Sequence, residues 1–422
     1  MLHSSEGPGS KHPAPTIYTY DVEIDYLYGE IQTLYEEVIE DRSWFKLDRR
    51  PFEHKFPQSL PHFLYRMELL CPYTIEGIES AVKRGSRLKA LSKLPGYVQL
   101  VDKSLLFRHI AAYLRSKKER LFKLVPVTFS FDAREVQFHR DIQRYCRIFL
   151  AIQNKTTPDK IEPLRVEVDE QSKVATPVYY ELKHTKFPQG TVVDRNGFEN
   201  PEWDELDFED TFFGEGTNKW MLKASFAERG AAIELFTNLD ELDVFLNLFL
   251  TGFNYCYLLH TTYGPEHSGS PSLFPGIKSE QETTVLTFPT FVIQKYMEKP
   301  QLIKGCKHTV RLYGLYTQEE KGYVYEEWYT GMCGLKFDLK NSNYICHITN
   351  MDFATNLPED EDTASFHCKS RKDTLKLVNI SEQDNIEILK LVFESMVRDG
   401  ISLLNPKGMA GVFEMFGLDI LY

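Results

Sequence analysis

The chain has 422 residues, a formal net charge of −12, and 26% charged and 42% hydrophobic residues. This composition is typical of a soluble globular protein, and the length accommodates two or three domains with cores of their own. The acidic balance argues against direct nucleic-acid binding, because contact with a phosphate backbone requires an excess of basic residues.

Neither a membrane span nor a secretion signal is expected. The most apolar stretch, residues 242–259, is interrupted by Asn247, Gly252 and Asn254, whereas a membrane helix needs ~20 mostly apolar residues. The first 16 residues lack an apolar signal core and predict a disordered tail. The 7 cysteines show no CxxC spacing, which disfavours a disulfide framework or a zinc site. We therefore expect a reduced, cytoplasmic protein.

The first half of the chain predicts an α/β segment followed by strands. Helix-like patterns alternate with short strands over residues 17–125, and residues 125–131 (VPVTFSF) predict a strand because they are rich in β-branched and aromatic residues. A strand–loop–strand follows in residues 219–236. Asn238 then predicts the start of a helix, since its side chain can cap the helix while Glu241 reaches back to the preceding backbone.

The second half predicts a loop, two strands rich in basic residues, and a final helix and strand. Residues 263–282 are rich in Gly, Pro and Ser and predict a flexible loop. Two strands follow within residues 290–317. Residues 381–400 predict a helix that begins at a Ser381 cap and ends at Gly400, and an apolar strand follows it.

The strand KHTVRLYGLYT (307–317) places basic residues on one side. Residues two apart in a strand share a face, so Lys307, Thr309 and Arg311 line one face. The other face, which we expect to pack on the core, holds His308, Val310 and Leu312. A bound polyanion would compensate the charged row, since unpaired buried charge is costly. A solvent-facing sheet surface is the simpler explanation for this stretch alone.

Two further residues suit a phosphate site. Lys223 closes an apolar strand, and the loop SFAERG (225–230) after it could fold backbone N–H groups over phosphates, although the single Gly230 is a weak signal. Asp419 ends the apolar run FEMFGLD and is a candidate Mg²⁺ ligand. A lone aspartate at a strand end is also a common turn residue.

These stretches, in this order, resemble the tubulin–tyrosine ligase-like family. The segments that carry the resemblance are WMLKASFAERGAAI (220–233), FVIQKYMEKPQLIKGCKHTVRLYGLY (291–316), CHITN (346–350) and FEMFGLD (413–419). The resemblance spans roughly residues 90–422, and QKYMEKPQLI is its most specific part. It implies an α+β chain with the ATP-grasp fold, in which the nucleotide lies between two α+β domains preceded by a smaller N-terminal α/β domain.

The resemblance implies a division of the chain. The expected parts are a disordered tail (1–16), an N-terminal domain (17–125), a central ATP-grasp domain with a lid loop (126–262), a flexible loop (263–289) and a C-terminal ATP-grasp domain (290–422). The last of these looks incomplete, because the family's next strand, with the glutamate and asparagine that complete its Mg²⁺ site, is absent after Asp419.

The resemblance also assigns residues to ATP. It implies that Lys223 and Lys307 meet the phosphates and that Arg229, Gly230 and Ile233 belong to the lid. It implies an adenine hinge, where backbone groups read the base edge, at Gln294, Lys295, Tyr296 and Met297.

The implied chemistry is activation of a protein carboxylate by the γ-phosphate, through an acyl-phosphate, followed by amine attack. Arg311 would face the transferred phosphate, Thr349 and Asn350 would lie near the nucleotide and the amino-acid substrate, and Asp419 would hold Mg²⁺. Charges placed around a developing anion supply the electrostatic part of such catalysis. The partner expected from the family is tubulin or another protein with an acidic tail.

The sequence departs from the family pattern in several places. Thr309 stands where the family has an aspartate. The expected lid contains few glycines, and the arginine expected after residues 322–329 is not evident. Two functions therefore stay open. The chain is an ATP-dependent protein–amino-acid ligase, or a degenerate or truncated ligase-like domain that serves as a nucleotide-binding or interaction module.

Two basic clusters stand out in the acidic chain, at residues 82–93 and 115–123. A concentrated basic face can steer an acidic protein tail toward the site. Solvated helix faces explain the same clusters without any partner.

Overall fold

The computed structural model describes most of the chain after residue 94. The described ranges are 94–168, 174–187, 198–206, 218–227, 232–254, 285–341, 343–349 and 368–421, with the short strands at 16–21, 46–51, 63–64 and 90–91. The expected flexible loop at 263–282 and nearly all of the expected tail lie outside these ranges. The expected α+β class is confirmed, because helices and several antiparallel sheets alternate along the chain.

The first large sheet has four antiparallel strands. Their spatial order is β5 (Thr128–Asp132), β12 (Thr290–Lys295), β8 (Trp220–Ala224) and β9 (Ile233–Phe236). All four were predicted as strands. Residues 290–295, which the sequence grouped with the C-terminal segment, therefore pair with strands of the central segment.

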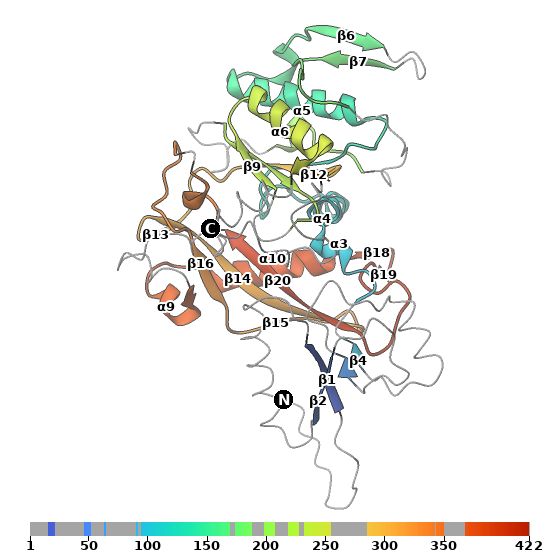
Figure 1. The fold of residues 1–422 in the computed structure, drawn as a ribbon, viewed down its shortest axis with the longest axis vertical. Coiled ribbons are helices and arrows are strands. Elements are labelled where there is room, and N and C mark those ends of the chain that lie inside the picture. The colour runs from blue at the N-terminus through green and yellow to red at the C-terminus, as the bar shows by residue number, and fades with distance from the viewer. Residues whose placement is uncertain are drawn as a thin grey trace, which may run out of the picture.

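An aromatic core covers one face of this sheet. The helices α5 (Phe138–Gln153) and α6 (Leu239–Thr251) lie on this side, above the sheet in Figure 1. Tyr145 from α5 makes edge contacts with Phe129 and Trp220, at centroid distances of 5.2 and 5.3 Å. Such aromatic packing contributes energy beyond simple burial.

The predicted start of α6 is confirmed. Asn238 Oδ1 accepts a hydrogen bond of 2.9 Å from the Glu241 amide, and the Glu241 carboxylate accepts one of 2.7 Å from the Thr237 amide. The cap satisfies backbone donors that the first turn leaves without helical partners.

The opposite face of the first sheet meets α4 (Lys103–Lys117), which follows the short helix α3 (Val98–Val101). Ser130 shares this face with Lys223 because both lie opposite Val292 in the strand register. α4 therefore covers part of the face that carries Lys223.

The second large sheet has six strands and centres on a long strand. The strand β14 (Cys306–Thr317) pairs antiparallel with β13 (Leu302–Ile303), β15 (Gly322–Val324), β16 (Tyr329–Met332) and β20 (Phe413–Leu421), and β16 pairs with β17 (Cys368–Ser370). The predicted alternation along β14 is confirmed, since Val310 and Leu312 are buried while Thr309 and Arg311 are half-buried. Lys307 departs from it, because its side chain is also buried.

The helix α10 (Glu382–Glu394) packs on the second sheet, behind β14 in Figure 1. Its Ser381 cap is confirmed, with Ser381 Oγ accepting from the Asp384 amide at 3.1 Å. The predicted end at Gly400 is wrong, because the helix ends at Glu394. Asp399 and Gly400 both have positive φ and form the turn between β18 (Val397–Arg398) and β19 (Ile401–Ser402), a two-residue hairpin that needs this conformation.

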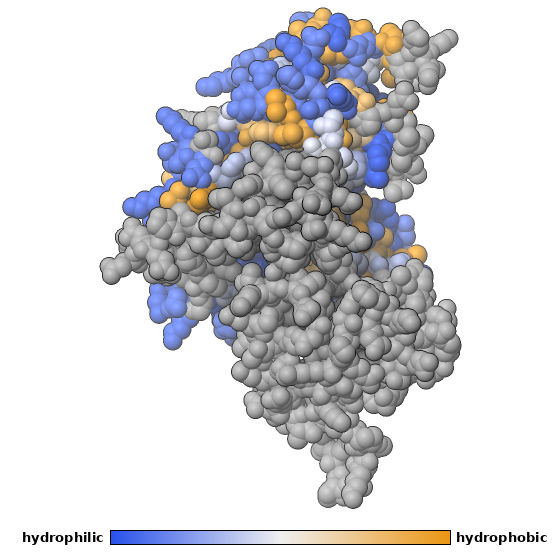
Figure 2. Space-filling view, in the orientation of Figure 1, coloured by the Kyte–Doolittle hydropathy of each residue, from blue (hydrophilic) through white to orange (hydrophobic). Residues whose placement is uncertain are grey.

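The remaining elements lie around these two sheets. A small parallel sheet near the N-terminus has the order β2 (Lys46–Pro51), β1 (Thr16–Asp21), β3 (Phe63–Leu64) and β4 (Ala90–Leu91). The others are β6 (Arg165–Val168), β7 (Ala175–Val178), β10 (Phe253–Asn254), β11 (Val285–Leu286), α9 (Arg371–Leu375), and the 3₁₀ turns η1 (Pro158–Lys160), η2 (Trp203–Glu205) and η6 (Tyr344–Cys346). Figure 2 shows apolar surface over the β6–β7 hairpin, where Leu164, Val166 and Val168 are exposed. Within the described ranges, no helix has the length and apolar character required to cross a membrane.

Candidate functional site

Lys223 and Gln294 connect the two central strands of the first sheet on the face away from the aromatic core. Lys223 Nζ donates to Gln294 Oε1 at 2.7 Å, and Gln294 Nε2 donates in turn to Thr128 Oγ1 at 3.0 Å. Burial first, and then the charges of Lys103 and Lys307, lower the pKa of the Lys223 ammonium to about 7. Neighbouring ammonium groups that lower one another's pKa create a positive environment, and this environment is suited to an anion.

Lys103 at the start of α4 is a third amine of this group, and the sequence analysis missed it. Its Nζ donates to the carbonyl oxygens of Ala227 at 2.7 Å and Ser225 at 3.5 Å, at the beginning of the expected lid loop. A single lysine at the start of a helix is part of no sequence motif that would indicate a binding site. Only the packing of α4 on the sheet brings this residue near Lys223.

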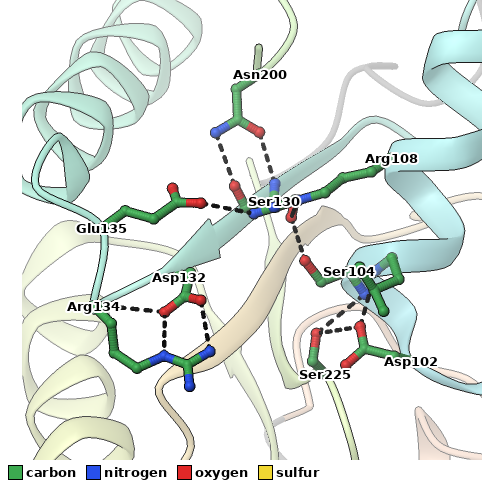
Figure 3. Close-up of polar contacts among 10 residues, drawn as sticks. Asp102, Ser104, Arg108, Ser130, Asp132, Arg134, Glu135, Asn200 and Ser225 are labelled. Carbon is green, nitrogen blue, oxygen red and sulfur yellow. Dashed lines mark hydrogen bonds and ion pairs between the residues drawn. The ribbon is translucent and has the colours of Figure 1, made fainter. Parts of the chain in front are cut away.

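A polar network fixes α4 to the sheet and to the start of the same loop (Figure 3). Ser225 Oγ donates to Asp102 Oδ1 at 3.1 Å and accepts from the Ser104 amide at 3.1 Å. Further along α4, the hydroxyl of Ser104 and the guanidinium of Arg108 both hydrogen-bond the Ser130 hydroxyl on β5. Hydrogen bonds to α4 therefore hold Ser225, where the loop begins after β8.

Lys307 lies between the two large sheets, with its amine against Tyr296. Its Nζ donates to the Tyr296 hydroxyl at 3.3 Å and is 4.3 Å from the centroid of the ring. The same hydroxyl is 2.8 Å from His347 Nδ1, and His347 Nε2 is 2.6 Å from the Asn341 carbonyl oxygen. Burial is the main reason that the pKa of the Lys307 ammonium falls to about 8.

In the segment expected to bind adenine, residues 294–297, most polar side chains already have partners within the chain. The Lys295 amine points to the aromatic side of the sheet and forms a buried ion pair with Glu298. The Tyr296 amide donates to the Lys219 carbonyl at 3.1 Å, and its side chain is held by Lys307. Met297 follows β12 and is half-buried. The polar side chains of this segment are therefore mostly engaged within the chain.

Arg311 and Asp419 face each other across paired strands. Arg311 Nη1 donates to Asp419 Oδ2 at 2.8 Å, and the two residues are direct partners in the β14–β20 register. Gly417 makes this possible, because a Cβ there would lie 2.3 Å from two guanidinium nitrogens of Arg311. The proposed phosphate contact and the proposed metal ligand are thus paired with each other.

Thr309 and Thr349 meet on the same face of the second sheet. Their hydroxyl oxygens are 2.9 Å apart, and both side chains are half-buried. The structure therefore brings Thr349 next to the strand that carries Lys307 and Arg311, although Thr349 lies 40 residues after Thr309 in the sequence.

Some predicted site residues lie outside the described ranges. These are Arg229 and Gly230 of the expected lid, and Asn350. Ile233, the last predicted lid residue, is the first residue of β9 and lies directly opposite Lys223 in the strand register.

The described residues offer a poor magnesium site. Among them, no group of three or more His, Cys, Asp or Glu side chains could hold a metal ion. Mg²⁺ prefers near-octahedral oxygen ligands, usually one or two carboxylates with phosphates and water. Asp419 is a single carboxylate that already bonds Arg311. By contrast, the amines of Lys103, Lys223 and Lys307 have the positive charge that phosphate groups require of a binding site.

Of the two basic clusters, the first lies almost entirely outside the described ranges. In the second, Arg115 pairs with Glu205 at 2.7 Å and Lys117 lies 5.5 Å from the centroid of the Tyr113 ring. At least part of the second cluster is thus engaged within the chain.

Comparison with known proteins identifies the family. The profile described as the tubulin-tyrosine ligase family matches residues 193–422, which is more than half of the chain. A search among curated proteins finds no match. The matched region contains Lys223, the β12–β14 segment and Asp419. The chain belongs to the tubulin-tyrosine ligase family.

Proposed function

We propose that this protein is an ATP-dependent ligase that joins an amino acid to a protein carboxylate, with a tubulin tail or another acidic protein tail as the acceptor. The observation that supports ATP binding is the pair of amines on Lys223 and Lys307. No carboxylate of the described residues pairs with either. Because unpaired charge is costly to bury, a bound polyphosphate would restore both amines to full charge.

The residues divide between the parts of the nucleotide. Lys223 and Lys307 would bind the phosphates, with Lys103 close to the same group and Arg229 and Gly230 in the lid. The base would lie along the segment from Gln294 through Lys295 and Tyr296 to Met297, with Met297 offering the backbone contact. Ile233 would end the lid, opposite Lys223 in the strand register. When bound, ATP would supply the γ-phosphate that activates the acceptor carboxylate.

The second sheet would hold the reacting groups. Arg311 offers a cation on the exposed face, and the Thr349 hydroxyl, next to Thr309, offers a hydrogen-bond donor or acceptor there. Asn350 would add an amide. Family membership supports a requirement for Mg²⁺ with Asp419 as a ligand, but the described residues alone do not build that site, and we assign no step to it.

A second function is favoured by one specific observation. Thr309 stands where the family has an acid, and Asp419 is engaged by Arg311, so acidic groups are scarce around the proposed phosphates. A chain of this kind could bind a nucleotide and act as an interaction module without transferring an amino acid.

Two measurements together test the proposal. Calorimetric titration with ATP and ADP measures nucleotide binding, and incorporation of labelled tyrosine, glutamate or glycine into tubulin measures ligation. Binding with incorporation supports the ligase, and binding without it supports the module. A chain that binds neither ATP nor ADP rules out both.

A further inference from the structure

A chain of hydrogen bonds runs from Lys307 through Tyr296 and His347 to the Asn341 carbonyl. That carbonyl determines which atom donates in each bond. The Asn341 carbonyl oxygen can only accept, so His347 Nε2, which is 2.6 Å away, carries the hydrogen. Burial is the largest cause of a lowered pKa for His347, so its ring is neutral at physiological pH. In the neutral ring, Nδ1 is then the acceptor.

The tautomer of His347 orients the hydroxyl of Tyr296. Because Nδ1 can only accept, the Tyr296 O–H donates to it across 2.8 Å. The hydroxyl hydrogen is therefore used, and an oxygen lone pair is left for the Lys307 amine at 3.3 Å. The ring of Tyr296 adds a second attraction, since Nζ lies 4.3 Å from its centroid and an aromatic face attracts a cation.

We propose that Tyr296 and His347 are positioning residues that hold the Lys307 ammonium in place and in its charged form for the phosphates of a nucleoside di- or triphosphate. This inference rests on the proposed nucleotide site. It gives the Tyr296 side chain a role that is separate from reading the base, and it gives His347 a role although the proposed nucleotide contacts do not include it. An ammonium has three donors, so the bond to Tyr296 leaves two for phosphate oxygens.

The surroundings of Lys307 make this support necessary. Lys307 is 3% exposed. The other titratable groups that act on it are Cys333, Cys346 and Lys219, and Lys307 in turn acts on Lys223. The thiols are buried, and burial raises the pKa of Cys333 to about 12, so it carries no negative charge at neutral pH. The charged groups that act on His347 are Lys219, Lys307 and Asp338. No described carboxylate therefore replaces the Tyr296 hydroxyl as a partner of Lys307.

The test removes single groups while keeping the shape of the site. Tyr296→Phe keeps the ring and removes the hydroxyl. His347→Gln supplies an amide oxygen that can still accept from Tyr296, whereas His347→Leu supplies none. Tyr145→Phe is the matched control, because the Tyr145 hydroxyl is equally buried and has no partner among the described residues.

Two readouts are needed. The first is the pKa of Lys307 in the nucleotide-free, full-length protein, followed by NMR of ε-¹³C-labelled lysine and assigned with Lys307→Arg. The second is ADP affinity by calorimetry between pH 6.5 and 8.5. Loss of one charge-assisted hydrogen bond should lower the pKa of Lys307 by about one unit in Tyr296→Phe and His347→Leu. ADP binding should then weaken by about tenfold at pH 8.5 and by less at pH 6.5.

The outcomes separate this inference from the proposed function. A lowered Lys307 pKa without any ADP binding, even by the unmodified protein, would support the hydrogen-bond chain and reject the nucleotide site. An unchanged Lys307 pKa in Tyr296→Phe, or a loss of ADP affinity that is equal at every pH, would overturn the inference. Recovery in His347→Gln but not in His347→Leu would confirm that an acceptor for Tyr296 is what His347 provides.

Discussion

Lys223 and Gln294 are joined by a 2.7 Å hydrogen bond from Nζ to Oε1 across strands β8 and β12. The bond holds the amine on the face that also meets α4, and it leaves its charge without a carboxylate partner among the described residues. An amide neutralises no charge, so this amine is suited to the bound anion that we propose. This relationship leads to the first two predictions.

Replacing either Lys223 or Lys307 with alanine should weaken ATP and ADP binding by about tenfold or more. A charge-assisted phosphate contact contributes ~1.5–3 kcal/mol. Lys390→Ala is the control, since that lysine is exposed on α10 and pairs only loosely with Glu394 at 3.7 Å. Calorimetry measures the affinities, and unchanged binding in both site variants would reject the assignment of these amines.

Nucleotide affinity should fall as pH rises above neutrality. The free protein has ammonium pKa values of about 7 for Lys223 and about 8 for Lys307, and bound phosphates raise both. The complex therefore holds more protons than the free protein above pH 7, and binding takes up protons. Affinity should drop by up to about tenfold per pH unit for each lysine, over a range in which phosphate, with a second pKa near ~6, is already ionised.

Calorimetry in two buffers of different ionisation enthalpy checks this directly, because proton uptake makes the apparent binding enthalpy depend on the buffer. The Lys223→Ala variant should take up fewer protons than the unmodified protein. A flat pH profile between 7.5 and 9, with no buffer effect, would contradict the predicted pKa values.

Much of the fold follows from local patterns, while the site depends on distant contacts. The alternation along β14 was predictable because side chains alternate every two residues, and the Asn238 and Ser381 caps because capping is local. Lys103 could not be found in this way, since its place beside Lys223 depends on how α4 packs. The interruption of the last helix at Glu394 was also missed, because the hairpin that follows it continues the apolar pattern with Met396, which is fully buried.

The pairing of Arg311 with Asp419 shows the same limit. Both residues were predicted as site residues, and the predicted face of Arg311 on β14 agrees with its half-buried side chain. Their contact depends on the β14–β20 register, which no spacing within either strand reveals. The structure thus turns two separate predictions, a phosphate contact and a metal ligand, into a single ion pair.

Glu234 should make the free energy of unfolding decrease as pH rises from about 4.5 to about 7. Burial raises its pKa to about 7, and its carboxylate accepts a 2.5 Å hydrogen bond from the hydroxyl of Tyr344 in η6. The folded state therefore binds more protons than the unfolded state from about pH 4.5 to 7, so stability is lost over that window, by roughly 1–3 kcal/mol.

The variant Glu234→Gln removes this titration and keeps an acceptor for Tyr344. It should be more stable than the unmodified protein at pH 8 and similar to it at pH 5. Thermal unfolding at both pH values measures the difference. Equal melting temperatures at pH 8 would mean that Glu234 is charged in the folded protein at no cost.

An acidic partner would be recognised electrostatically. Reversing the charges of Lys83, Arg84 and Arg87 should reduce binding to an acidic tubulin-tail peptide, and the deficit should shrink in high salt as screening increases. The matched control reverses three exposed lysines elsewhere, Lys155, Lys160 and Lys183. A deficit that does not depend on salt, or no binding by the unmodified chain, would remove tubulin tails from the proposal.

Ligase activity of this chain on tubulin with tyrosine, glutamate or glycine should be about 10²-fold or more below that of an active family member, while nucleotide binding survives. Thr309 stands where the resemblance to the family leads us to expect an acid, and its hydroxyl is engaged by Thr349 at 2.9 Å. Asp419 is engaged by Arg311, so the cation proposed for the transferred phosphate and the ligand proposed for Mg²⁺ hold each other. Loss of one electrostatic stabiliser commonly costs ~10²–10³ in rate, and here several are changed together. Incorporation of labelled amino acid is the measurement, with an active family member as the positive control. Robust incorporation by this chain would show that Thr309 and a single carboxylate at Asp419 suffice for transfer.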